Sequence, residues 1–168
     1  MPYSDHFNLA DDFIVHLDIS IAGIGDPFIR SRYVGFVAVS AATVYELAIK
    51  DIFISFASRK NKVLGNFTRK YFDRINGQVG RDRIVNNYLP LFGEKYVKRF
   101  HAKIEKAEID FLKADKISIK SSYSNLLTWR HSFAHEGVIP VNVTYEEVKK
   151  SYQYGCRLIH CLAETMNR

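Results

Sequence analysis

Cysteine, proline and tryptophan are scarce in this sequence of 168 residues, which holds 2 cysteines, 4 prolines and 1 tryptophan. Cys156 and Cys161 lie five positions apart on an expected helix, a spacing that does not suit a disulfide bond. We therefore expect two free thiols, as in proteins of a reducing cytoplasm. No cysteines and histidines have the spacing of a zinc finger. The sequence thus excludes a disulfide scaffold.

Long uninterrupted apolar runs are also missing. The longest apolar stretch, residues 36–54, contains Glu46, Lys50 and Asp51, and a membrane span would not tolerate these charges. The first residues lack the basic, apolar and small-residue regions of a signal peptide. We therefore expect a cytoplasmic protein with no membrane partner.

Apolar residues make up 47% of the chain and recur with helical spacing almost throughout. The pattern predicts helices over residues 4–21, 27–58, 94–113, 121–137 and 144–166, with shorter helices between 61 and 93. The second helix is apolar on nearly all sides, which is typical of a helix at the centre of a bundle. We expect one domain over residues 1–168 with an all-α fold, a helical bundle of five to seven helices with a long central core helix.

Local residue types predict where these helices begin, turn and end. Turns are expected at residues 65–66, 76–77 and 89–90, and an extended connection at 138–143. Ser121 or Ser122 is expected to cap one helix, which ends at Gly137, a residue suited to the left-handed conformation after a helix. Thr144 is expected to begin a capping box before the last helix.

The positive charge is concentrated in one part of the chain. The net charge is +6, whereas residues 59–103 alone carry 12 basic and only 3 acidic residues. Such a surface would attract a polyanion, and its aromatic rings could stack on unpaired bases; these are Tyr71, Phe72, Tyr88, Phe92, Tyr96 and Phe100. Helical spacing favours the alternative that the rings face the core, while the charge excess fits either an RNA-binding or a merely solvated face.

The stretch from Trp129 to Gly137 places an arginine and two histidines at the end of an expected helix. Arg130 is always cationic, and His135 can give or take a proton near neutral pH. Charge stabilisation and proton transfer are what cleavage of a phosphodiester requires. His131 and His135 are four positions apart and share a face, whereas Arg130 can converge with His135 only if the last turn frays.

Three interpretations of these residues are open. In a ribonuclease, His135 would act as base on the ribose 2′-OH or as acid on the 5′-oxygen, with Arg130 on the phosphate and a dimer supplying a second group. In a zinc site, His131 and His135 would be two ligands, although no third ligand stands out by spacing. In a purely structural interpretation, the helix dipole favours cationic side chains at this end.

The motif Arg130-His131-Ser132-Phe133-Ala134-His135, set near the end of an all-α bundle with a long apolar second helix, resembles the HEPN superfamily (higher eukaryotes and prokaryotes nucleotide-binding domain). The resemblance covers residues 28–166 and is strongest to stand-alone proteins of bacterial conflict systems. It implies a metal-independent endoribonuclease that needs no cofactor, binds RNA, and acts as a homodimer with the motif at the interface. It also implies a toxin or phage-defence role, with an antitoxin or another defence-system protein as partner.

The resemblance also assigns roles to particular residues. It implies that Arg130 and His135 are essential, that His131 supports them, and that an acid on the core helix assists, a position that Glu46 matches. Glu46 fits an ion pair with Lys50 equally well. A non-catalytic module of the same fold that binds RNA, a nucleotide or a protein is the alternative, and a structural scaffold is a third hypothesis.

Overall fold

A computed structural model describes residues 3–138 and 142–167, so most of the predicted extended connection lies outside the described residues. Within these residues the structure contains seven α-helices and no strand, which confirms the all-α prediction. The helices are α1 (Asp5–Ile21), α2 (Pro27–Lys60), α3 (Lys62–Phe72), α4 (Arg81–Arg83), α5 (Glu94–Ala114), α6 (Ile119–Glu136) and α7 (Tyr145–Met166). A π-helical turn (Ile84–Tyr88) and a 3-10 turn (Leu89–Phe92) join α4 to α5. No helix in the described ranges is long and apolar enough to cross a membrane.

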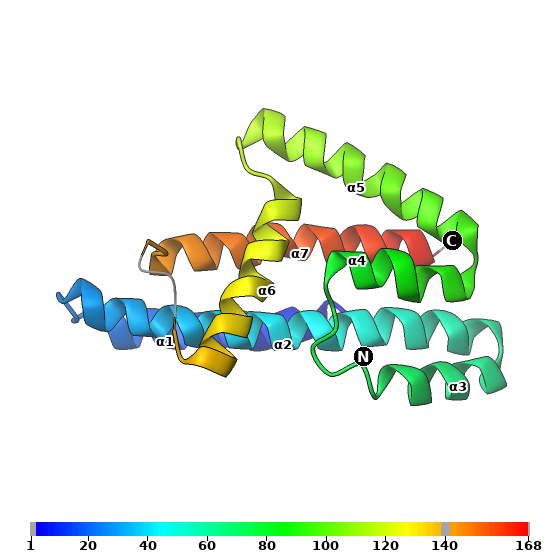
Figure 1. Cartoon of the computed structure of the whole chain (residues 1–168), viewed down its shortest axis with the longest axis horizontal. Coiled ribbons are helices and arrows are strands. Elements are labelled where there is room, and N and C mark those ends of the chain that lie inside the picture. The colour runs from blue at the N-terminus through cyan, green and yellow to red at the C-terminus, as the bar shows by residue number, and fades with distance from the viewer. Residues whose placement is uncertain (1–2, 139–141, 168) are drawn as a thin grey trace.

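The 34-residue helix α2 is the central element of the bundle. It contacts α1, α3, α6 and α7, which confirms the prediction of a long core helix. In Figure 1, α7 runs alongside α2, α3 folds back on the opposite side, and α6 crosses α2 steeply. At its start, Asp26 accepts a hydrogen bond from the backbone N–H of Phe28, and Pro27 occupies the first helical turn.

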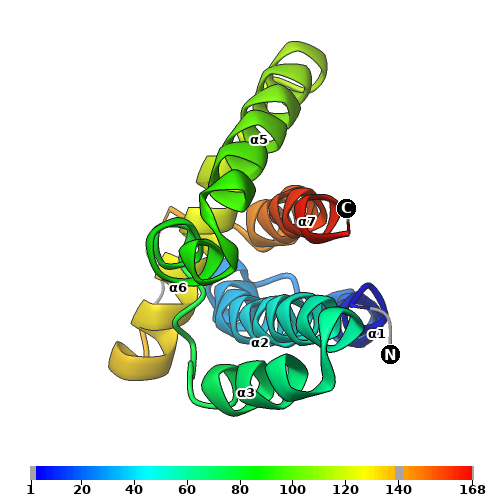
Figure 2. The ribbon, with the colours of Figure 1, turned by 90° about the vertical axis from the view of Figure 1, so that its right-hand side faces the viewer.

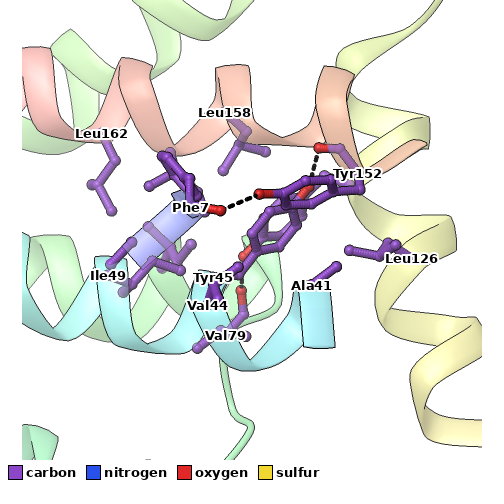
Figure 3. Packing of buried hydrophobic residues seen from close by; sticks show 14 of the residues in the cluster. Phe7, Ala41, Val44, Tyr45, Ile49, Val79, Leu126, Tyr152, Leu158 and Leu162 are labelled. Carbon is purple, nitrogen blue, oxygen red and sulfur yellow. Dashed lines mark hydrogen bonds between the residues drawn. The ribbon is translucent and has the colours of Figure 1, made fainter. Parts of the chain in front are cut away.

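Three buried tyrosines join α2, α6 and α7 in the core, and Figure 3 labels two of them, Tyr45 and Tyr152. The ring of Tyr45 stacks on Tyr123 with centroids 5.1 Å apart and on Tyr152 at 5.9 Å. The Tyr45 hydroxyl donates to the carbonyl of Tyr152, whose own hydroxyl donates to the carbonyl of Phe7 in α1. Burial raises the pKa of Tyr45 and Tyr152, so both phenols stay protonated and able to donate.

The turn predicted at residues 65–66 is wrong, because α3 runs through it without a break. A β-carbon at Gly65 would lie 2.8 Å from the Cα of Ser58, so the glycine allows α3 to fold back closely on α2. The turn at Asn76 and Gly77 is confirmed, since both residues have positive φ, 30° and 77°. The turn predicted at 89–90 is wrong, because the 3-10 turn Leu89–Phe92 continues directly from the π-helical turn and the chain leaves helical structure only at Gly93, with φ 111°.

The start of α6 also differs from the prediction. The cap is Ser118, which accepts a hydrogen bond from the backbone N–H of Ser121, rather than Ser121 or Ser122. The buried carboxylate of Glu108 in α5 accepts hydrogen bonds from the Ser118 hydroxyl and from the backbone N–H of Lys120. The first turn of α6 is therefore fixed by a residue that is distant in sequence. The predicted cap of α7 is confirmed, since Thr144 accepts from the N–H of residue 147.

The C-terminal end of α5 projects away from the bundle, as Figure 2 shows.

Most aromatic residues of the basic segment 59–103 face the core, as helical spacing predicts; Phe72, Tyr88, Tyr96 and Phe100 are buried. Two rings on α3 are exceptions, since Phe67 is 72% exposed and Tyr71 is 40% exposed. Cys156 and Cys161 are free thiols, as expected, and burial raises the pKa of Cys156 to about 12.

Candidate active site

The motif occupies the last two turns of α6. The helix ends at Gly137, which adopts the left-handed conformation with φ 68°, and the N–H of Gly137 donates to the carbonyl of Phe133. His131 and His135 are exposed and lie one turn apart, with ring centroids 4.6 Å from each other. The prediction that the two histidines share a face is therefore confirmed.

Arg130 lines a small cavity between α2, α6 and the loop that follows α3. The cavity has a volume of about 100 Å³ and is lined by Ala42, Thr43, Glu46, Gly77, Val79, Leu127, Arg130 and His131. The Arg130 guanidinium lies against Gly77, with Nη2 3.5 Å from the point that a β-carbon on Gly77 would occupy. His131 lines this cavity and also contacts His135, so it connects the arginine with the outer histidine.

Glu46 lies in the same cavity and holds the loop. Its Oε2 atom accepts a hydrogen bond of 2.6 Å from the backbone N–H of Gly77, and its Oε1 atom pairs with Lys50 Nζ at 2.6 Å. The ion pair with Lys50, which the sequence offered as an alternative, is thus present together with a contact to the loop beside Arg130. Each carboxylate oxygen has a partner, and this arrangement suits a residue that positions the loop.

Arg130 and the two histidines keep their polar atoms available. Within residues 3–138 and 142–167, none of the three side chains makes an ion pair or a side-chain hydrogen bond. The planar guanidinium of Arg130 can therefore offer its donors to two oxygens of one phosphate. Among the same residues, no group of three or more His, Cys, Asp or Glu side chains is arranged to hold a metal ion.

The bundle and its motif match a known protein family. The profile of the RiboL-PSP-HEPN family aligns with residues 4–168, which is nearly the whole chain. The chain belongs to this family. The resemblance of the sequence to the HEPN superfamily is confirmed, and the match includes α1 as well as the bundle from residue 28 onward. No curated protein and no solved structure matches the chain.

Family membership indicates the general activity of domains of this kind. HEPN domains are commonly ribonucleases, bind RNA and often form dimers. An arginine and two histidines at the end of the penultimate helix are chemically suited to that activity, since they offer one fixed cation and two imidazoles that can transfer protons.

Two tyrosines hold the loop of this HEPN domain, a role that the sequence did not predict for either. The Tyr88 hydroxyl donates to the carbonyl of Gln78 at 2.6 Å, and the Tyr123 hydroxyl donates to the carbonyl of Val79. Burial raises the pKa of both phenols, which keeps them protonated as donors. With Glu46 bound to Gly77, three consecutive loop residues are each fixed by a side chain from another element.

Phe133, in the middle of the motif, fixes the end of α6 on α2 of the HEPN bundle. Its ring lies directly on the backbone of Gly35, and a β-carbon on Gly35 would be 2.1 Å from the nearest ring atom. The ring also contacts Phe36 edge to face, with centroids 5.5 Å apart. The shapes of the two residues are complementary, because the missing side chain of Gly35 leaves room for the ring of Phe133. The sequence alone does not show this contact.

Proposed function

We propose that this HEPN domain is a metal-independent endoribonuclease in which Arg130 and His135 are the catalytic residues. One observation carries the proposal: Arg130 and His131 line one cavity, and the ring of His131 contacts that of His135 on the exposed face of α6. A phosphate at the mouth of this cavity would reach the guanidinium while its ribose reaches the outer imidazole. Family membership supports the choice of RNA.

The proposed reaction is attack of a ribose 2′-oxygen on the adjacent phosphorus. Neutral His135 removes the 2′-OH proton while the new P–O bond forms, the bond to the 5′-oxygen breaks, and a second group protonates that leaving oxygen. The products are a 2′,3′-cyclic phosphate and a 5′-hydroxyl. Arg130 stabilises the charge of the pentacovalent phosphate, and His131 orients the phosphate or shares the proton transfer.

The second proton-transfer group would come from another copy of the chain. In-line displacement needs the acid and the base on opposite sides of the phosphorus, and a two-fold dimer places two copies of one motif face to face. Apolar side chains beside the motif support such a contact, since Phe36 is 49% exposed and Val138 is 56% exposed. We expect Phe36→Glu to give a monomer by light scattering, with unchanged helical content and without cleavage activity.

The basic segment, residues 59–103, would guide RNA to the cleft of this dimer. Eleven of its 12 basic residues are exposed, and Lys103 is partly buried and paired with Glu164. Binding through several phosphates releases counterions, so affinity should fall steeply as salt is added.

Cleavage of labelled total tRNA and of an unstructured RNA in the presence of EDTA tests the activity. The wild type should cut, His135→Ala and Arg130→Ala should not, and the matched variant His16→Ala should cut normally because His16 lies exposed on α1. Full activity of His135→Ala would overturn the assignment. RNA binding without cleavage by the wild type would instead indicate a non-catalytic binding module.

We further propose a role as a toxin or phage-defence effector, with an antitoxin or another defence-system protein as partner. Expression of the wild type should slow bacterial growth, and expression of Arg130→Ala or His135→Ala should not. Equal growth with all three proteins would argue against a toxin.

A further inference from the structure

A second and larger cavity lies between α3, α4 and the π-helical turn. Its volume is about 490 Å³, within the range of roughly 300–1,000 Å³ typical of sites for small ligands. The helix α3, which carries Phe67, Lys70 and Tyr71 of the lining, lies on the side of α2 opposite α7 (Figures 1 and 2). Neither Arg130 nor either motif histidine lines it, so it is separate from the candidate active site.

The cavity is cationic. Lys70, Arg74 and Arg83 line it, and its lining contains no carboxylate. None of these three side chains forms an ion pair with any residue in the described part of the chain. Three unpaired cations around one cavity repel one another and lower the free energy of an entering anion, and a phosphate group suits the fork of an arginine.

The part of the lining that α3 supplies also carries aromatic rings, beside Lys70. Phe67 is 72% exposed and Tyr71 is 40% exposed, although both are large apolar rings on α3. Tyr71 contacts the buried ring of Tyr88 edge to face, with centroids 6.3 Å apart. The core therefore supports the ring of Tyr71. Exposed aromatic faces next to cations are the combination that binds the bases and phosphates of single-stranded nucleic acids.

The cavity is joined to the active site by the loop after α3. Gly77 lines the cavity of Arg130, and the next residue, Gln78, lines the cationic cavity. Glu46 and Tyr88 hold these two residues in place through hydrogen bonds of 2.6 Å each. A strand whose scissile phosphate lies at Arg130 can therefore continue over this loop into the second cavity.

We propose that this cavity binds one nucleotide of a single-stranded RNA next to the bond that is cut. The phosphate binds Lys70, Arg74 and Arg83, the base stacks on Phe67 and Tyr71, and the side-chain amide of Asn87 meets the base edge. Asn87 both donates and accepts hydrogen bonds, so this contact gives the enzyme a base preference. The inference rests on the proposed function for its substrate, but the binding itself needs no catalysis.

Fluorescence anisotropy with a labelled single-stranded RNA, measured in the inactive His135→Ala protein, tests the proposal. The added substitutions Lys70→Ala and Arg74→Ala should together weaken binding at least about tenfold, since each removes a charged contact. They should also reduce the slope of log affinity against log salt by up to about 0.7, the value for one phosphate of a single strand. Lys106→Ala together with Lys113→Ala is the matched control and should change affinity little, because both lysines are exposed on α5, outside the cavity lining and outside the basic segment.

A second pair of variants tests stacking. Tyr71→Ala should weaken binding about fivefold or more, whereas Tyr71→Phe keeps the ring and should bind nearly as the parent does. Circular dichroism and melting temperature should show that all variants fold. Equal affinity of the Lys70/Arg74 and Lys106/Lys113 variants, or no RNA binding by the parent, would overturn the proposal.

The same measurements separate this inference from the proposed function. RNA binding that depends on Lys70 and Arg74, in a protein whose wild type never cleaves, would support the cavity and refute the ribonuclease. Cleavage that is unaffected by the Lys70/Arg74 substitutions would refute the cavity alone. If free mononucleotides bind in a way that requires Arg74, while Arg74→Ala leaves RNA binding unchanged, the cavity is a site for a free nucleotide. That result would overturn the proposal that the cavity binds part of an RNA strand.

Discussion

The ring of Phe133 occupies the space that any side chain at Gly35 would need. A β-carbon on Gly35 would lie 2.1 Å from Cδ2 of Phe133 and 2.3 Å from its Cγ. The overlap reaches the ring atom that is bonded to the β-carbon of Phe133, so a rotation of the ring alone would not remove it. This contact sets the distance between α2 and the end of α6, and with it the position of Arg130 and His135 relative to the loop at Gly77.

Gly35→Ala should therefore disturb the site without removing a polar group. We expect a loss of about 1–3 kcal/mol in the free energy of unfolding, as for other overpacked contacts, and reduced RNA cleavage. In a Phe133→Ala background, the same substitution should cost little, because the space is then free. Urea denaturation of the two single variants and the double variant measures this coupling. Additive effects would show that the two residues do not constrain each other.

Substitutions of Glu46 distinguish a positioning role from proton transfer. Glu46→Gln loses the ion pair with Lys50 but can still accept the hydrogen bond from the N–H of Gly77. It should keep most of the cleavage rate, whereas Glu46→Ala should lose about tenfold or more, because a charge-assisted hydrogen bond contributes about 1.5–3 kcal/mol. If the two variants lose activity equally, Glu46 acts through its charge or its proton instead.

Tyr123 should support the same loop from the core side. Tyr123→Phe leaves the buried carbonyl of Val79 without its donor, which should cost about 1–3 kcal/mol of stability and speed amide exchange over residues 76–80. Tyr71→Phe is the control, since the Tyr71 hydroxyl makes no hydrogen bond with a residue that the structure describes. Unchanged exchange in Tyr123→Phe would mean that the loop is held without this bond.

His160 predicts a pH dependence of stability. Burial, and then the nearby Arg157, lower the pKa of His160, against an opposing effect of Glu164, while Nδ1 hydrogen-bonds to the hydroxyl of Tyr3 at 2.8 Å. Below the unfolded pKa of about 6.5, the unfolded chain therefore binds more protons than the folded one. Stability should fall as the pH decreases from about 6.5 toward the lowered folded pKa.

Urea denaturation at several pH values between neutrality and mild acid measures this loss. His160→Gln should be less sensitive to acid than the wild type, because glutamine does not titrate. A variant with the same slope of stability against pH would assign the acid sensitivity to other groups.

Local sequence patterns were sufficient to predict most of the fold. The all-round apolar character of α2 marked it as the central helix, and Gly137 and Thr144 marked helix ends, because such residues act on their own backbone. The predictions of the α6 cap and of the turn at Gly65 failed because residues on other helices determine the local structure there. Ser118 caps α6 because Glu108 binds its hydroxyl, and Gly65 lies inside a helix because Ser58 packs against it.

The candidate site could be predicted in part for the same reason. Arg130, His131 and His135 follow one another along a single helix, so their common location was visible in the sequence. The residues that position them belong to α2, the π-helical turn and the core of α6, and their contacts depend on the packed fold. Glu46 was found by resemblance, while the roles of Gly35, Tyr88 and Tyr123 had no sequence pattern to indicate them.

The ends of the RNA fragments test the central claim most directly. A defined single-stranded RNA is incubated with the wild type in EDTA, beside His135→Ala, and the products are analysed by mass spectrometry. The account predicts fragments with a 2′,3′-cyclic phosphate and a 5′-hydroxyl from the wild type and intact RNA from the variant. Fragments with a 5′-phosphate, cleavage only after a metal is added, or equal cleavage by His135→Ala would contradict it.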